Sequence, residues 1–123
     1  MARILVVEDN RENRALMTYL LAHFGHEVEE AVDGIDGLAK AKASDHDLAV
    51  LDLQMPGLDG YEVLAALRAD PHLTSMPVIA VTAFSMAGDR ERILAAGFDE
   101  YISKPINPRT FADQIAVHAV TAG

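Results

Sequence analysis

The stretch LAVLDLQMPGLDG, residues 48–60, places an acid directly after four apolar residues. Residues 48–51 have the length and composition of a strand that is covered on both faces. Met55-Pro56-Gly57 is typical of a turn, so the strand must end shortly before it. Asp52 therefore stands at the carboxyl end of a buried strand. The role of the Asp52 carboxylate depends on which other polar side chains lie next to it in the folded protein.

Four more short runs of strand-forming residues occur along the chain, and segments with helical patterns separate them. This alternation predicts βα units on a mostly parallel sheet, in an α/β fold. One run, residues 27–32, mixes acids with valine and is expected to be less buried than the others. The predicted strands are residues 4–7, 27–32, 48–51, 78–82 and 101–103, and the predicted helices are residues 15–24, about 34–42, 61–67, 90–96 and 108–120.

In the first predicted helix, the stripe expected to pack inward consists of Ala15-Leu16, Tyr19-Leu20 and His23-Phe24, and it ends at Gly25. His23 and His26 stand on either side of that glycine, so they do not share a helix face and are not expected to bind a metal. Asp59-Gly60 is expected to be a turn that starts a helix.

Composition and charge narrow the class of protein. A chain of 123 residues fits one domain spanning residues 1–123, and the absence of cysteine excludes a disulfide framework and thiol chemistry. Half the residues are apolar, but no apolar run reaches bilayer-spanning length, so membrane insertion is not expected. The absence of cysteine suits a reducing cytoplasm, and we expect a monomer there. The net charge of −9 repels phosphate backbones, so direct nucleic-acid binding is not expected.

The carboxyl ends of the predicted strands gather polar residues at one edge of the sheet. Ligands of open parallel sheets bind at that edge. Three acids brought together there repel each other by about 1 kcal/mol per pair at 4 Å in bulk water and about 4 kcal/mol at an effective dielectric near 20, so a cation is expected among them. The residues at this edge are Glu8, Asp9 and Asn10, then Asp52, Thr82, and finally Ser103-Lys104-Pro105.

The residue types at this edge suit phosphoryl transfer. An oxygen-only set of Glu8, Asp9 and Asp52 favours a hard divalent ion, and Mg²⁺ fits best because it shares its shell with waters and phosphate oxygens. Lys104 supplies a compact positive charge for a phosphate, and the Thr82 hydroxyl can donate a hydrogen bond to one of its oxygens. Catalysis at such a site consists mainly of positioning and charge neutralisation.

Four fragments in this order, ILVVEDN, LDLQMPGLDG, VTA and SKP, resemble the receiver domain of two-component response regulators, over essentially the whole chain. The resemblance implies a flavodoxin-like (βα)5 fold, with a five-stranded parallel sheet in order 2-1-3-4-5 and helices on both faces. It implies that Asp52 is the phosphoacceptor. It also implies that the phosphodonor is a phosphohistidine on a histidine kinase or a histidine phosphotransfer protein.

The same resemblance assigns roles around Asp52. It implies that Glu8, Asp9 and Asp52 hold Mg²⁺, together with the backbone carbonyl of Gln54. Lys104 is expected to pair with the phosphoryl group or, without it, with the carboxylate of Glu8 or Asp9. In the family, a cis peptide bond precedes the proline that stands here as Pro105.

The resemblance further implies a switch that acts on a downstream protein target. Thr82 would move toward the phosphoryl group and Tyr101 would swing inward behind it, changing the face formed by the fourth helix, the fifth strand and the fifth helix. In the family, the positions that stand here as Gln54 and Phe84 flank the path of the water that hydrolyses the acyl phosphate. Because Phe84 is bulky, we expect a long-lived phosphorylated state.

Several alternatives remain. A phosphohydrolase that forms an aspartyl phosphate needs a second Asp where Gln54 stands, so no enzyme is expected beyond self-phosphorylation from phosphodonors and slow autodephosphorylation. A flavin-binding module needs a phosphate-cradling loop where Glu8 and Asp9 stand.

A phosphorylation-independent docking receiver is a further alternative. The run AGDRERILAAGFDEYISKPI, residues 87–106, resembles both single-domain regulators of the cell-cycle or developmental type and receivers of hybrid sensor kinases. Asn13 is a candidate contact of the phosphoryl group or of a neighbouring loop.

Overall fold

The computed structural model describes residues 2–83 and 88–120, with side chains through residue 118. Its five strands form one sheet in the order β2-β1-β3-β4-β5, and every neighbouring pair is parallel. This confirms the flavodoxin-like fold expected from the sequence. The elements are β1 (Arg3–Val7), α1 (Arg11–His23), β2 (Glu27–Ala31), α2 (Gly34–Ala43), β3 (Leu48–Asp52), α3 (Gly60–Ala69), β4 (Val78–Thr82), α4 (Asp89–Ala96), β5 (Glu100–Ser103) and α5 (Phe111–Val120).

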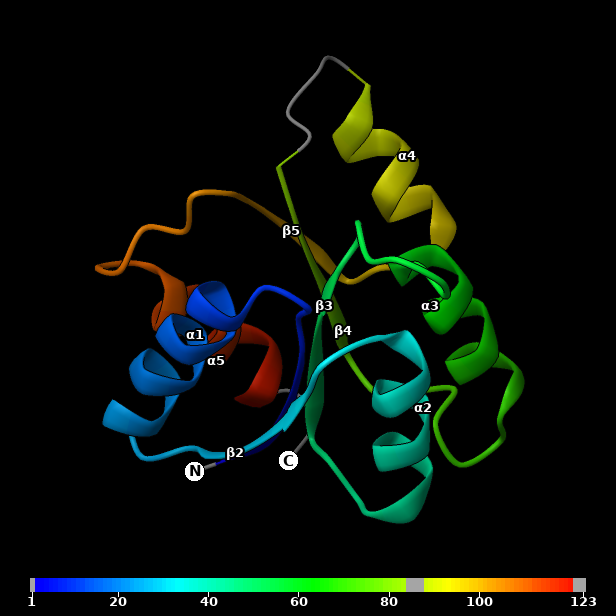
Figure 1. Ribbon diagram of the computed structural model, residues 1–123, viewed down its shortest axis with the longest axis horizontal. Helices are drawn as coiled ribbons and strands as arrows, with labels where there is room; N and C mark the ends of the chain where they lie inside the picture. Colours follow the sequence, from blue (N-terminus) through cyan, green and yellow to red (C-terminus); the bar gives the residue numbers. More distant parts are fainter. Residues whose placement is uncertain (1, 84–87, 121–123) are drawn as a thin grey trace.

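Helices cover both faces of the sheet, with α1 and α5 on one side and α2, α3 and α4 on the other (Figure 1). Each side has its own core, because alternate residues of every strand point to opposite faces. Leu5 and Leu51 belong to the core beneath α2, α3 and α4, whereas Ile4 and Val50 belong to the core beneath α1 and α5. Within the described part of the chain, no helix is long and apolar enough to cross a membrane.

The sequence composition of each strand matches its place in the sheet. The central strands β3 and β4 are buried at every position, as expected for strands covered on both faces. The edge strand β2 contains three glutamates, and Ala31 is its one fully buried residue. The prediction that residues 27–32 are less buried is therefore confirmed.

Helix α1 begins earlier than predicted, at Arg11. The side chain of Asn10 accepts a hydrogen bond from the backbone N–H of Asn13 at 2.9 Å, which satisfies one of the free donors of the first turn. The prediction missed this start because residues 11–14 are polar and carry no apolar periodicity. The cap places the helix directly after the acid pair of the β1–α1 loop.

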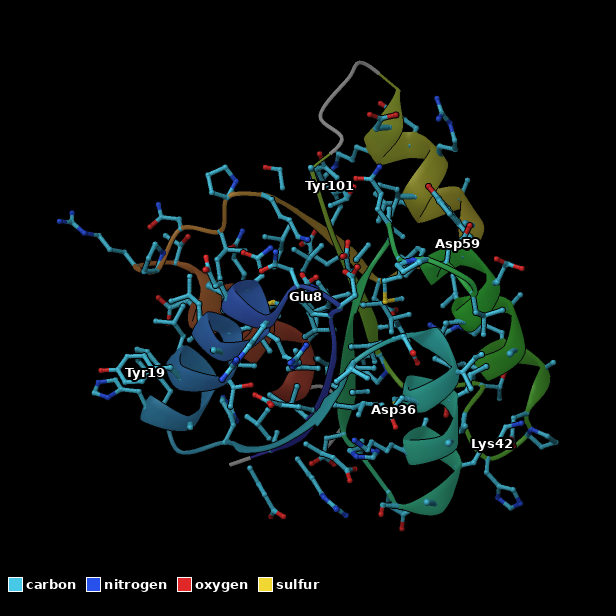
Figure 2. The ribbon with its side chains drawn as sticks, in the orientation of Figure 1. Glu8, Tyr19, Asp36, Lys42, Asp59 and Tyr101 are labelled. Atoms are coloured by element: carbon cyan, nitrogen blue, oxygen red, sulfur yellow. The ribbon has the colours of Figure 1, made fainter. Side chains whose placement is uncertain are left out.

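The predicted inward stripe of α1 is wrong except at Leu20, which the core does bury. The side chains that the core buries are Met17, Leu20 and Leu21, whereas Tyr19 and Phe24 are 67% and 56% exposed. Two apolar stripes, one residue apart, overlap in this helix, and periodicity alone does not distinguish them. Figure 2 shows Tyr19 projecting outward from the helix.

Helix α5 starts at Phe111, three residues later than predicted. A turn precedes it, in which the carbonyl of Asn107 accepts hydrogen bonds from the N–H groups of Thr110 and Phe111. The Asn107 side chain accepts a further bond from the N–H of Arg109 at 3.0 Å. Asparagine commonly replaces regular backbone pairing with such local bonds, which explains the later start.

Helix α3 starts at the expected turn and lies very close to the end of β3. Asp59 caps it and forms reciprocal hydrogen bonds with Glu62, a capping box. Gly60 follows, and a Cβ atom there would lie 2.7 Å from the carbonyl oxygen of Asp52 and 2.8 Å from the Cα of Leu53. Only glycine permits this approach without movement of the strand end that carries Asp52.

Candidate functional site

Three polar residues that are buried as whole residues in the described part of the chain lie at the carboxyl edge of the sheet. Glu8 follows β1, Asp52 ends β3 and Thr82 ends β4, and their residues are 0%, 3% and 0% exposed. Because the sheet is parallel, the ends of these neighbouring strands meet at one edge. The register carries Ser103 of β5 opposite Thr82, so Lys104 emerges at the same edge.

Lys104 joins two of the acids. Its Nζ lies 2.9 Å from Glu8 Oε1 and 3.3 Å from Asp52 Oδ2. The sequence-based expectation paired Lys104 with Glu8 or Asp9; the lysine contacts Glu8, and its second carboxylate is Asp52. Figure 2 shows Glu8 in the middle of the molecule, at the end of β1. The Lys104–Pro105 peptide bond, immediately after this contact, is cis.

Backbone N–H groups orient the two buried carboxylates. Asn10 N–H donates to Glu8 Oε2 at 3.1 Å, and Gln54 N–H donates to Asp52 Oδ1 at 3.1 Å. In each case the donor lies two residues after the acid, in the loop that leaves the strand. These bonds hold one oxygen of each carboxylate against the backbone of the following loop. The other oxygen of each carboxylate lies beside Lys104 Nζ.

The acids are close enough to bind one cation. Carboxylate oxygens of Glu8, Asp9 and Asp52 lie within 4.8 Å of one another, and Asp9 is exposed while the other two are buried. Oxygen-only donors with an exposed member suit Mg²⁺, which keeps several waters. Glu8 Oε1 accepts no well-aligned hydrogen bond from the described residues, so this buried oxygen retains capacity for a further partner. The residues therefore fit a magnesium ion.

The charges at the site perturb each other strongly. Burial and a hydrogen bond with Asp52 raise the pKa of Glu8 to about 7, although Lys104 and Asn10 N–H act in the opposite direction. Burial opposes the charged form of Lys104, but its contacts with Glu8 and Asp52 outweigh this and raise the lysine pKa. Without a divalent cation, the site contains one lysine charge against several carboxylates.

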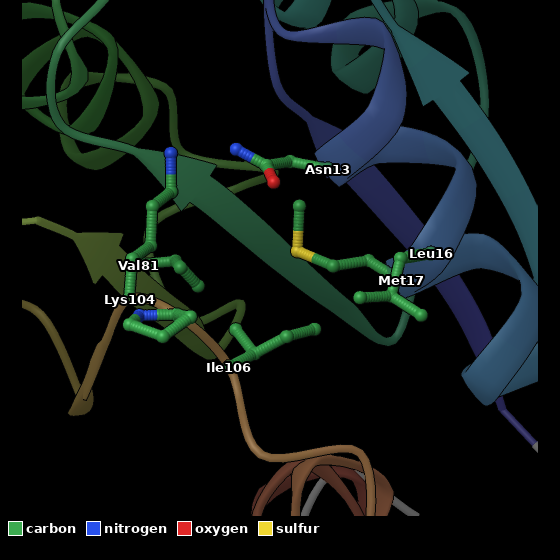
Figure 3. Close-up of a pocket in the computed structure, with 7 residues that line it drawn as sticks. Asn13, Leu16, Met17, Val81, Lys104 and Ile106 are labelled. Atoms are coloured by element: carbon green, nitrogen blue, oxygen red, sulfur yellow. The ribbon is translucent and has the colours of Figure 1, made fainter.

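A small cavity of about 60 Å³ lies beside Lys104, between α1 and the β5–α5 loop. Figure 3 shows the amide of Asn13 and the amino group of Lys104 at the same end of this cavity, with apolar side chains below them. Its apolar lining comes from α1, from the end of β4 and from the β5–α5 loop: Leu16, Met17, Val81, Pro105 and Ile106. Asn13 therefore lies near the lysine, where the sequence suggested a contact with the phosphoryl group or a loop.

The remaining predicted site residues lie farther out or outside the described residues. The side chain of Gln54 is exposed, and its backbone N–H contacts Asp52. Tyr101 is half-buried on β5, and it packs against the core beneath α4. Phe84 lies outside the described residues.

The site residues also contact groups that the sequence does not single out. The N–H donors of Asn10 and Gln54 are backbone atoms, so no residue type signals them. Arg14 is a side chain, and its Nη1 donates to the backbone carbonyl of Glu8 at 2.8 Å. Its signal is weak, because one arginine among the polar residues that open a helix is unremarkable in a single sequence.

A five-stranded doubly wound sheet whose carboxyl edge presents three carboxylates, a threonine and a lysine is the arrangement expected above for a receiver domain. The chain belongs to the response regulator receiver domain family, which residues 4–116 match.

Three named proteins are similar to this chain over most of their length. The chain is 41% identical over 112 residues to the polar-differentiation response regulator DivK of Brucella ovis, covering 91% of each chain. Among solved structures it is similar to chemotaxis response regulator CheY4 of Vibrio cholerae, with 30% identity, a TM-score of 0.90, and 96% and 98% of the two chains covered. It is also similar to the receiver domain of sensor histidine kinase PA1611 from Pseudomonas aeruginosa, with 32% identity, a TM-score of 0.88, and 97% and 98% covered. The PA1611 receiver holds a magnesium ion in its active-site cleft.

Proposed function

We propose that this receiver domain accepts a phosphoryl group on Asp52 from a phosphohistidine of a histidine kinase or histidine phosphotransfer protein. The observation that carries the proposal is the position of Lys104, whose amino group lies between the carboxylates of Glu8 and Asp52. A lysine in that position neutralises negative charge on the phosphoryl oxygens as they arrive at Asp52.

The transfer requires one bond to form and one to break. A carboxylate oxygen of Asp52 attacks phosphorus, the phosphorus–nitrogen bond of the phosphohistidine breaks, and the donor imidazole leaves with the electron pair and takes up a proton. No general base on this chain is needed, because a carboxylate nucleophile has no proton to lose when it attacks. The hydrogen bond from Gln54 N–H to Oδ1 holds the carboxylate in place for this step.

Magnesium completes the charge balance. Glu8, Asp9 and Asp52, with the backbone carbonyl of Gln54, are the groups that would hold it. When bound, Mg²⁺ neutralises charge on the phosphoryl oxygens and on the acids around them. The magnesium ion in the PA1611 receiver and the close approach of the three carboxylates here both support this assignment.

The phosphorylated domain signals through its surface. Thr82 would bind a phosphoryl oxygen, Tyr101 would move inward behind it, and the α4-β5-α5 face would change its contacts with a downstream protein. The buried position of Thr82 at the end of β4 and the half-buried position of Tyr101 one strand away support this coupling. To change the ratio of the signalling conformer to the resting conformer from 1:99 to 99:1, the phosphoryl group must stabilise the signalling conformer by about 5.5 kcal/mol more than the resting one. Charge-assisted hydrogen bonds of about 1.5 to 3 kcal/mol each are sufficient to supply it.

We further propose that the protein acts as a single-domain regulator, which the similarity to DivK over 91% of that relative's length supports. A cytoplasmic location is part of the proposal, and the absence of cysteine supports it. The receiver of a hybrid sensor kinase is the second candidate, favoured by the similarity to the PA1611 receiver. Neither role needs turnover of a substrate.

Intact-mass measurement tests the proposal. The protein is incubated with acetyl phosphate and Mg²⁺, with EDTA replacing Mg²⁺ in a parallel sample and Asp52→Asn as the matched variant. We expect one added phosphoryl group that requires both Mg²⁺ and Asp52. An equal gain in the Asp52→Asn variant contradicts the assignment, and no gain in any sample favours a phosphorylation-independent docking domain.

A further inference from the structure

The backbone of Glu8 is held from both sides. Its N–H donates to the carbonyl of Ala31 in β2 at 3.1 Å, and its own carbonyl accepts a hydrogen bond from Arg14 Nη1 at 2.8 Å. The first bond continues the pairing of β1 with β2. The second bond comes from α1, so Arg14 ties the end of β1 to the helix that follows it.

Arg14 is itself fixed by a second contact. Its Nε lies 3.7 Å from Glu30 Oε1, and the arginine side chain is only 14% exposed. The other oxygen of that carboxylate, Oε2, accepts a hydrogen bond from the Thr18 hydroxyl at 2.6 Å. The backbone carbonyl of Glu30 also accepts a bond from Lys40 Nζ at 2.6 Å. Glu30 is therefore an anchor shared by α1, β2 and α2.

Arginine suits this position for a geometric reason. A planar guanidinium donates hydrogen bonds in several fixed directions within its plane. Arg14 therefore directs Nη1 to the Glu8 carbonyl while its Nε points toward Glu30. A lysine ammonium keeps the charge but lacks the fixed fork that serves both partners. The contact is also to the backbone of Glu8 rather than to its carboxylate, whose pKa is governed by burial, Asp52, Lys104 and Asn10.

From these contacts we propose that Arg14 is a positioning residue for the magnesium site, acting through the Glu8 backbone and anchored by Glu30. The inference rests on the function proposed above. Holding the Glu8 carbonyl fixes the start of the β1–α1 loop, and this loop carries the carboxylates of Glu8 and Asp9. If that restraint is released, the two acids must be ordered when the cation binds, which lowers the affinity.

The test measures Mg²⁺ affinity directly, by following the amide signals of Asn10 and Gln54 in ¹⁵N-labelled protein during a MgCl₂ titration. We expect Arg14→Gln to weaken binding about tenfold, in line with residues that support metal ligands indirectly. Arg14→Lys is expected to recover less than half of that loss, on a logarithmic scale. Arg11→Gln is the matched control, because it removes the same charge from an exposed position on the same helix.

Glu30→Gln provides an independent variant at a partly exposed position, so the test does not depend on the stability of Arg14→Gln. We expect Glu30→Gln to weaken Mg²⁺ binding and to add less than about twofold in the Arg14→Gln background, since Glu30 acts through Arg14. The inference is overturned if both single variants bind Mg²⁺ like the unaltered protein. It is also overturned if Arg14→Lys restores binding fully, because charge alone would then explain the effect.

These affinities are separate from the phosphorylation result. An unaltered protein that binds Mg²⁺ but takes no phosphoryl group contradicts the proposed function and leaves the role of Arg14 to be decided by the titrations. A protein that is phosphorylated normally, with equal affinities in all variants, contradicts the inference alone.

Discussion

Lys104 Nζ lies 3.3 Å from Asp52 Oδ2, in contact with the carboxylate proposed to accept the phosphoryl group. The same amino group lies 2.9 Å from Glu8 Oε1. The lysine thus partly neutralises, in the absence of a metal, the repulsion that the sequence predicts among the acids. Mg²⁺ and Lys104 therefore act on the same charges.

This contact predicts opposite effects of Lys104→Met on binding and on transfer. Loss of the lysine charge leaves the acids less neutralised, so we expect Mg²⁺ to bind at least as tightly as in the unaltered protein. Transfer from acetyl phosphate should slow about 100-fold, the typical cost of removing one preorganised group that stabilises developing charge. Lys42→Met, at an exposed position on α2, is the control. Weaker Mg²⁺ binding with unchanged transfer contradicts the role of Lys104.

The raised pKa of Glu8 predicts that Mg²⁺ binding depends on pH. In the metal-free protein, a pKa of about 7 instead of 4.5 means that folding favours the protonated carboxyl. The contribution of Glu8 to the free energy of unfolding is therefore fully present below pH 4.5, and it is lost as the pH rises through about 7. Mg²⁺ binds the carboxylate, so the affinity should rise with pH across this window and level off above it.

Calorimetry at about pH 6 checks this linkage, because binding should then release protons. We expect the measured enthalpy to differ between buffers of high and low ionisation enthalpy, and the difference to disappear in Glu8→Gln. An affinity that is equal on both sides of the pKa contradicts the assignment of Glu8 as a metal ligand that titrates near neutrality.

Gly60 predicts a link between packing and phosphorylation. A Cβ atom at this position would lie 2.7 Å from the Asp52 carbonyl oxygen, so Gly60→Ala must displace the end of β3. We expect a loss of about 1 to 3 kcal/mol in the free energy of unfolding, and slower phosphorylation of Asp52. Ala65→Ser, at an exposed position of α3, should change both by far less. Urea denaturation and intact-mass kinetics provide the two measurements, and unchanged kinetics contradicts the link.

Arg68 stabilises the opposite end of the sheet without contacting the site. Its guanidinium donates to the carbonyls of Thr74, Met76 and Gly97, and to the carboxylate of Asp99. We expect Arg68→Ala to reduce the free energy of unfolding by about 2 kcal/mol, since several carbonyls lose a charged donor. Thermal denaturation beside the exposed control Arg109→Ala measures this, and Mg²⁺ affinity should not change. A loss equal to that of the control contradicts the stabilising role.

The sequence predicted the sheet well because the strand signal is strong. Continuous apolar runs placed β3 and β4 within one residue, and the acidic residues of β2 predicted its lower burial. Helix faces were harder to predict, since the two overlapping stripes of α1 differ only in which of them the core covers. That choice depends on tertiary packing, which buries Met17 and leaves Tyr19 exposed.

The side chains of the candidate site were predictable because parallel strands bring their carboxyl ends together. Glu8, Asp52, Thr82 and Lys104 follow from that rule and from their residue types. The contacts that orient them were not predictable in the same way. Backbone donors carry no residue signal, and Arg14 contacts Glu8 from the start of α1, in polar residues where no apolar periodicity predicted a helix.

The central claim is that the phosphoryl group forms an acyl phosphate on Asp52. Borohydride reduces an acyl phosphate of aspartate to the alcohol homoserine, so the modified residue is identified by peptide mapping of the reduced, phosphorylated protein. The account predicts homoserine at position 52, formed only when the phosphodonor and Mg²⁺ were both present. Homoserine at another acid, or phosphorylation that leaves position 52 unreduced, would contradict it.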